Sequence, residues 1–267
     1  AAPRSPYRHL ELCGIALYLY KQAHPSAAPY WAARRGMCFA FIRFYLLPAS
    51  AFLLTLFAAP LPRGQSAPKS YVPALHPLLD FGLEKVLVCT YQAISGAGKT
   101  FETMPEILDN VIPYIGGEEE KSEQEPMKIW GHIEGDQIVN ATSPSVTAQC
   151  LRVPVSDGHT AAVFASFDKK ISMEEIIQKW ESYRGAAQEL ELPSAPKQFL
   201  HYFHENDRPQ AKLDRNLENG MAVSIGRLRP DSQYDIKFVC LSHNTLRGAA
   251  GGAVLMAELL CAKGYLD

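Results

Sequence analysis

Apolar and polar residues alternate with the period of β-strands in several segments, all of which lie after position 70. Residues 85–93 form a β-branched apolar run that ends in small residues, and 145–155 and 159–167 lie on either side of an Asp-Gly turn. Segments 221–228 and 234–242 flank a Pro-Asp-Ser turn, so they predict a β-hairpin.

Ser172 and Glu175 have the spacing of a capping box, which predicts that a helix begins after Ser172. Its apolar residues recur at helical spacing and should be buried: Ile176, Ile177, Trp180 and Tyr183. Helices are also predicted at 105–112, at 118–130, at 71–81 as the end of a helix, and from about 246 to 263. Because strands, helices and hairpins are mixed, the sequence predicts an α/β fold of the α+β kind with a mixed sheet.

The first 70 residues follow neither period and differ in charge from the rest. Residues 1–79 hold a single acidic residue, Glu11, against eight basic ones, whereas the remainder holds 27 acidic and 18 basic residues. Residues 37–60 are apolar and long enough for a membrane span, but Arg43 and Pro48 interrupt them. A membrane or targeting segment stays open as an alternative. We favour a frameshifted, misassembled or wrongly predicted start, which leaves 1–70 unassigned and 71–267 as the folded domain.

Composition narrows the class of partner. The net charge of −2 implies no nucleic-acid partner. The six cysteines are scattered, without the spacing of a zinc site, a redox pair or a disulfide framework. We therefore expect no metal site and a cytoplasmic location, and we do not favour a membrane as partner.

The most informative stretch for chemistry is Arg152-Val-Pro-Val-Ser-Asp-Gly-His159. Extended chain on both sides of the Asp-Gly turn would direct Arg152 and His159 toward one pocket. An arginine donates two parallel hydrogen bonds to a carboxylate, and a histidine transfers protons near neutral pH. An exposed arginine and a hydrogen-bonded loop histidine remain the alternative for this segment alone.

Further polar residues lie at the ends of predicted elements. Gln92 ends the strand at 85–93, and the glycine turn Ser95-Gly96-Ala97-Gly98 after it could offer backbone N–H groups to an anion. Glu125 and Lys128 stand three apart on one helix face, so both could reach one pocket, although a surface ion pair has the same spacing. Glu118–Glu120 are expected to be a solvated helix start.

Several motifs stand in the order of a known family. They are 90–98, 110–121, 125–128, 152–160, 193–198, 207–210 and 242–252, the last being Ser-His-Asn-Thr-Leu-Arg-Gly-Ala-Ala-Gly-Gly. In these motifs the chain resembles the aspartate-semialdehyde dehydrogenase family of the archaeal and fungal type. The resemblance implies a domain like the C-terminal domain of glyceraldehyde-3-phosphate dehydrogenase. Its helices would lie on one face, and its last helix would return toward a Rossmann domain.

The resemblance also implies an activity, the NADP-dependent reductive dephosphorylation of aspartyl phosphate to aspartate semialdehyde in lysine, threonine and methionine biosynthesis. It makes His159 the acid/base and Gln92 the residue that positions the acyl group. Arg152, Glu125 and Lys128 would bind the substrate and phosphate. The cofactor-binding residues would be Ser95, Gly96, Gly98 and Asn244. A homodimer or homotetramer is expected, with strand residues such as Val223, Ile225 and Ile236 at the subunit contact.

The chain departs from the family in its N-terminal part. It has no Gly-x-Gly-x-x-Gly motif and no Asn-x-Asn-Cys turn, and the position of the nucleophilic cysteine falls near Gln65 or Ser66. Cys150 is the one conceivable substitute, and we expect the chain as printed to be inactive, because a thioester needs a thiolate. A non-catalytic dimerisation remnant stays open, as do malonyl-CoA reductase and N-acetylglutamyl-phosphate reductase.

Overall fold

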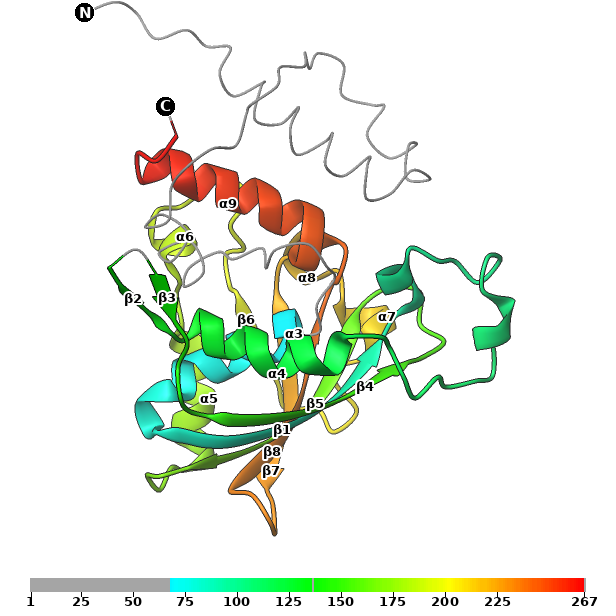
Figure 1. The fold of residues 1–267 in the computed structure, drawn as a ribbon, viewed down its shortest axis with the longest axis horizontal. Coiled ribbons are helices and arrows are strands. Elements are labelled where there is room, and N and C mark those ends of the chain that lie inside the picture. Colours follow the sequence, from blue (N-terminus) through cyan, green and yellow to red (C-terminus); the bar gives the residue numbers. More distant parts are fainter. Residues whose placement is uncertain (1–67, 136, 267) are drawn as a thin grey trace, which may run out of the picture.

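The computed structural model of this chain describes residues 68–135 and 137–266. The expectations for residues 1–67, including the cysteine position near Gln65 or Ser66, lie outside the described residues. Figure 1 shows a twisted sheet with helices stacked along one side of it.

The sheet has six strands in the order β4-β1-β5-β8-β7-β6. Strand β1 pairs in parallel with β4 and antiparallel with β5, and β8 joins β5 to β7 by antiparallel pairing. The predicted mixed sheet is therefore confirmed. The strands are β1 Leu83–Gln92, β4 Ser145–Arg152, β5 His159–Phe167, β6 Leu200–Phe203, β7 Val223–Pro230 and β8 Ile236–Ser242, and β2 His132–Glu134 pairs separately with β3 Gln137–Val139.

The longest helices are α4 Glu118–Ile129 and α9 Gly251–Ala262, followed by α5 Met173–Ser182 and α3 Pro68–Leu75. The capping box before α5 is confirmed, since Ser172 Oγ accepts from Glu175 N at 3.1 Å and Glu175 Oε2 accepts from Ser172 N at 2.8 Å. The shorter pieces are η1 His76–Phe81, η2 Ile94–Ala97, η3 Pro105–Ile107, α6 Ala186–Glu189, α7 Ala211–Asp214, α8 Leu217–Gly220 and the π-helix η4 Leu246–Ala250.

The core fills the space between the helices and one face of the sheet. Trp180 of α5 is fully buried, donates from Nε1 to Ala74 O at 2.7 Å and packs edge-to-face on Phe238. Val223, Ile225 and Ile236 are 0% exposed in this same core. They are covered by their own chain, so the expectation that they form the subunit contact is wrong.

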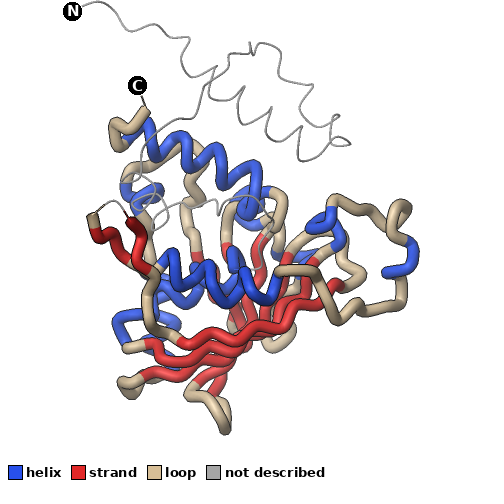
Figure 2. The backbone as a smooth tube through the Cα atoms, viewed as in Figure 1, coloured by secondary structure: helices blue, strands red, loops and turns tan. Residues whose placement is uncertain are grey.

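The opposite face of the sheet carries the alternate residues of the same strands. Leu87 and Cys89 of β1, Phe164 of β5 and Val239 of β8 are half-buried there. Figures 1 and 2 show that the helices of the described residues lie on the other side. We call these four apolar residues the open face. Lys237 borders them, with its Nζ 5.9 Å from the centre of the Phe164 ring.

Three predicted details differ from the structure. Only Pro105–Ile107 of the predicted helix at 105–112 is helical, since Pro113 follows closely and Leu108 is extended. Strand β4 ends at Arg152 instead of 155. Strands β4 and β5 do not pair around the Asp-Gly turn, because β1 lies between them.

No helix within 68–135 or 137–266 is long and apolar enough to cross a membrane.

Candidate functional site

Three of the candidate side chains meet at one edge of the sheet. Gln92 ends β1 and is the register partner of Arg152, which ends the parallel strand β4. His159 begins β5, which is antiparallel to β1 and therefore starts at the same edge. The three side chains are 1%, 7% and 2% exposed, so each has left bulk water on folding.

Ala93 connects the arginine to the histidine through its backbone. Its N–H donates to His159 Nδ1 at 3.1 Å, and its carbonyl oxygen accepts from Arg152 Nη1 at 2.8 Å. Because Nδ1 accepts this bond, the neutral imidazole carries its proton on Nε2. The backbone of Ala93 thus fixes both the ring orientation and the tautomer of His159.

Gly96 lies against both side chains. A Cβ added to Gly96 would be 2.6 Å from Arg152 Nη1, 3.0 Å from His159 Cε1 and 3.1 Å from His159 Nε2. The guanidinium and the imidazole therefore converge on the same space beside Gly96. The structure brings Arg152 and His159 together, although through their shared neighbour β1 and not through a hairpin.

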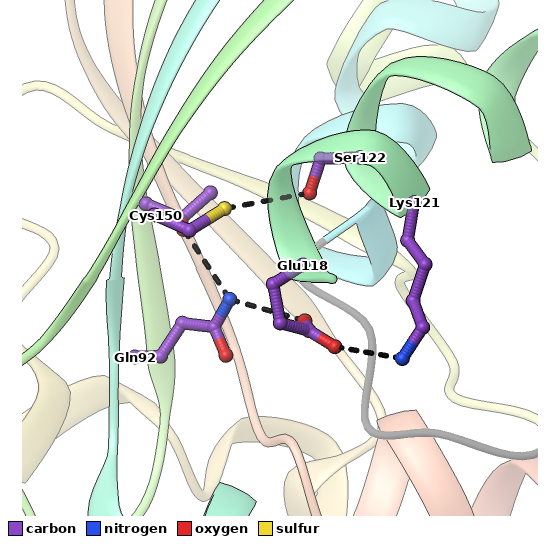
Figure 3. Close-up of polar contacts among 6 residues, drawn as sticks. Gln92, Glu118, Lys121, Ser122 and Cys150 are labelled. Carbon is purple, nitrogen blue, oxygen red and sulfur yellow. Dashed lines mark hydrogen bonds and ion pairs between the residues drawn. The ribbon is translucent and has the colours of Figure 1, made fainter. Parts of the chain in front are cut away.

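Glu118 is the first residue of α4 and is only 7% exposed. Its Oε2 accepts from Gln92 Nε2 at 3.2 Å, and its Oε1 lies 3.1 Å from Lys121 Nζ (Figure 3). Burial lowers the pKa of Arg152, and the nearby Glu118 carboxylate opposes that shift. We call Gln92, Glu118, Arg152 and His159 the strand-end site.

Glu125 and Lys128 are not part of the strand-end site. Glu125 lies seven positions after Glu118, which is about 10 Å along a helix axis, and Glu125 acts electrostatically on Tyr71 instead. Lys128 is exposed in the last turn of α4. Glu118 and Lys121 have the same three-residue spacing, so spacing alone could not distinguish the two pairs. The expectation of a solvated helix start overlooked Glu118.

Cys150 is 0% exposed, and its Sγ lies 3.6 Å from Ser122 Oγ under helix α4. Burial raises the pKa of this thiol, and the hydrogen bonds of Thr90 and Ser122 oppose that shift. A buried thiol with a raised pKa forms little thiolate near neutral pH, so Cys150 is poorly suited as a nucleophile.

Within the described residues no group of three His, Cys, Asp or Glu side chains could hold a metal ion.

The glycine turn differs from the expectation. The N–H groups of Ser95, Gly96 and Gly98 donate to the carbonyl oxygens of Ser156, Ala93 and Ser95. They are therefore already used within the chain and are not directed at an anion.

Asn244 bridges this turn to the segment before His159. Its Nδ2 donates to Ser95 Oγ at 2.9 Å, and its Oδ1 accepts from Gly158 N at 2.8 Å. Both ends of the Asn244 amide are engaged, and the residue is 3% exposed. Ala97 and Gly98 are exposed, and a Cβ at Gly98 would meet nothing within 4 Å. These two residues form the accessible part of the turn.

Comparison with known proteins gives matches in one family. Residues 75–247 match the family described as semialdehyde dehydrogenase, dimerisation domain. The chain is 46% identical over 189 residues to the aspartate-semialdehyde dehydrogenase of Archaeoglobus fulgidus, covering 71% of this chain and 54% of that protein. It is 37% identical over 267 residues to the aspartate-semialdehyde dehydrogenase of Cryptococcus neoformans, covering 98% of this chain and 69% of that protein. The second alignment therefore extends into residues 1–67.

A solved structure has the same fold. The crystal structure of aspartate semialdehyde dehydrogenase with NADP from Candida albicans superposes with a TM-score of 0.68 at 40% identity, covering 75% of this chain and 57% of that one. The chain thus spans little more than half the length of the Archaeoglobus and Candida proteins.

Proposed function

Because the chain belongs to the aspartate-semialdehyde dehydrogenase family, we propose that its strand-end site binds aspartate semialdehyde and aspartyl phosphate. The strand-end site would take part in the NADP-dependent reductive dephosphorylation of aspartyl phosphate. The relatives reported above favour this assignment over malonyl-CoA reductase, N-acetylglutamyl-phosphate reductase or a non-catalytic dimerisation remnant.

One observation carries the proposal: two buried side chains of opposite charge, Arg152 and Glu118, flank Gln92. An amino acid with a side-chain aldehyde or acyl phosphate carries both a carboxylate and an ammonium group. The Arg152 fork matches the carboxylate, and the Glu118 carboxylate matches the ammonium group. A carboxylate can accept about four hydrogen bonds, so Glu118 can accept from an ammonium group in addition to Gln92 and Lys121, and the pair favours a zwitterionic ligand over a neutral aldehyde.

His159 supplies the proton in this proposal. Its Nε2–H lies beside Gly96, next to the Arg152 guanidinium. From there it can donate a hydrogen bond to an oxygen of the bound acyl group. Taking the proton of a thiol at Nε2 requires the other tautomer, in which Nδ1 carries the proton and gives up the bond from Ala93 N. Gln92, at the end of β1, positions the ligand and thereby its acyl group.

Lys121 is the proposed phosphate ligand of this chain. Its ammonium group is 3.1 Å from Glu118 and its side chain is 42% exposed. A compact cation that is accessible to solvent and adjacent to the strand-end site suits a phosphate group. Lys121 and Glu118 therefore replace Lys128 and Glu125 in the proposed substrate site.

NADP, when bound, supplies the hydride of the reaction. The accessible residues Ala97 and Gly98 are the part of the turn that could contact NADP. Ser95 binds Asn244, and Gly96 leaves room for the side chains of Arg152 and His159.

We assign the catalytic and dimerisation domain to 71–267 and leave 1–70 unassigned. The four cysteines among the described residues are free thiols, which fits a cytoplasmic location.

The open face is the proposed contact of a homodimer. It carries apolar strand residues that no described helix covers, and apolar residues of this kind are typical of subunit interfaces.

The activity is tested by joining residues 68–267 to a cofactor domain that carries an Asn-x-Asn-Cys turn. The fusion should oxidise aspartate semialdehyde in the presence of phosphate and NADP, and His159→Ala should lower kcat roughly a hundredfold or more. A folded fusion without turnover, or one that is unaffected by His159→Ala, contradicts the proposal.

A further inference from the structure

Thr90 lies two residues before Gln92 on the same face of β1 and is 0% exposed. Its Oγ1 is 3.4 Å from Gln92 Nε2. Across the parallel pair its register partner is Cys150, whose thiol is hydrogen-bonded with Thr90 and Ser122. The hydroxyl therefore stands between the thiol and the amide of the strand-end site.

The chemistry of the partners determines which way the Gln92 amide faces. A side-chain amide nitrogen only donates, and an ionised carboxylate only accepts. Nε2 therefore has to face Glu118 Oε2, at 3.2 Å, and the Thr90 hydroxyl is the second acceptor on that side. In Figure 3 the side-chain oxygen of Gln92 points away from Cys150. This oxygen is left to accept hydrogen bonds from a ligand.

We propose that Thr90 is a positioning residue that holds Gln92 Nε2 toward helix α4, so that Oε1 and the Glu118 carboxylate together accept from the ammonium group of the ligand. The inference rests on the proposed function for the identity of the ligand. It adds to that function a residue that acts through Gln92 without touching the substrate.

The surroundings of Thr90 keep its hydroxyl in place. Since that hydroxyl accepts from Gln92, its own proton is available to the Cys150 thiol, a weak acceptor. Ser122 Oγ lies 3.6 Å from the same thiol, and Tyr71 Oη donates to Ser122 O at 2.5 Å. Tyr71, Ser122 and Cys150 are each 1% exposed or less, so no bulk water competes for these bonds.

The experiment compares Thr90→Val, which removes the hydroxyl at nearly constant volume, with Thr90→Ser, which keeps it. Thr147→Val on the exposed side of β4 is the matched control. The first readout is hydrogen exchange of the Gln92 side-chain amide by NMR, with the signal assigned from Gln92→Met. The second is the ratio of affinities for aspartate semialdehyde and for succinic semialdehyde, which lacks the ammonium group.

Thr90→Val should speed exchange of the Gln92 amide roughly threefold or more and reduce the affinity ratio roughly two- to tenfold. Thr90→Ser should keep the exchange rate and the affinity ratio of the wild type, and Thr147→Val should change neither quantity. If Thr90→Val does not fold, Thr90→Ala takes its place. Unchanged exchange in a folded variant without the hydroxyl overturns the inference. If the wild-type chain binds neither aldehyde, the proposed function fails, while the exchange measurement still decides the role of Thr90.

Discussion

The side-chain nitrogen Nε2 of Gln92 lies 3.2 Å from Oε2 of Glu118, although 26 positions separate the two residues. This bond joins the end of β1 to the first turn of α4 and places a buried carboxylate at the sheet edge where Arg152 and His159 also lie. Opposite charges thereby flank one amide, and this arrangement underlies the proposed recognition of an amino acid.

The assignment of the phosphate ligand predicts a difference between two lysines of α4. Lys121→Met should weaken the binding of inorganic phosphate roughly two- to fivefold, as expected for one partly exposed charge. Lys128→Met removes a lysine of the same helix that lies in its last turn, and should leave the affinity unchanged. Isothermal titration with phosphate checks this. Equal losses in the two variants would mean that Lys121 has no special role.

Gly96 should not tolerate a side chain. Gly96→Ala places a methyl group 2.6 Å from Arg152 Nη1, so the guanidinium has to move away from Ala93 O and the affinity for aspartate semialdehyde should fall roughly tenfold or more. Gly98→Ala is the control, because its methyl group meets no atom within 4 Å. An alanine at the positive φ of Gly98 should cost about 1 kcal/mol of stability without reducing the affinity for aspartate semialdehyde. Thermal unfolding together with ligand titration separates the two effects.

The stability of the fold should decrease as the pH falls below about 6.5. Burial lowers the pKa of both His76 and His243 from 6.5, partly opposed by Asp80 and Asp157 respectively. The unfolded chain therefore takes up these protons first, and each histidine can remove up to about 1.4 kcal/mol per pH unit between its unfolded and folded pKa. The stabilising effect of the neutral rings is fully present only above the unfolded pKa.

Urea unfolding from pH 7.5 to 5.5 measures this slope. His243→Gln should flatten it, whereas His132→Gln at an exposed position should leave it as in the wild type. A slope that is unchanged by His243→Gln and by His76→Phe would assign the pH dependence to other groups.

The open face predicts the response of the dimer to a charge. Leu87→Asp introduces a carboxylate beside Phe164 on the open face and should shift the chain toward the monomer at micromolar concentration. Leu213→Asp replaces an apolar residue that is 56% exposed on α7 and should not change the assembly. Sedimentation velocity decides, and a monomeric wild-type chain would contradict the proposed interface.

The elements with strong local signals could be predicted from the sequence. The capping box at Ser172, the hairpin of β7 and β8 and the helix 118–130 all appear where their patterns placed them. These features depend on neighbours in the chain, so a local pattern carries enough information.

Features set by long-range contacts could not be predicted in this way. The insertion of β1 between β4 and β5 follows from pairing across more than 50 residues, which a local turn signal does not report. The burial of Glu118 depends on Gln92 reaching α4, and Glu125 had the same local pattern with Lys128. The burial of Val223, Ile225 and Ile236 likewise depends on which face of the sheet the helices cover.

The central claim is that Arg152 and Glu118 recognise an amino acid at the strand-end site, and calorimetric titration of Glu118→Gln and Glu125→Gln tests it most directly. The wild-type chain should bind aspartate semialdehyde more tightly than succinic semialdehyde. Glu118→Gln should remove most of that preference, because the binding free energy for aspartate semialdehyde loses about 1.5–3 kcal/mol with one charge-assisted hydrogen bond. Glu125→Gln should retain the preference. Equal affinities of the wild-type chain for the two aldehydes, or loss of the preference in Glu125→Gln alone, would contradict the account.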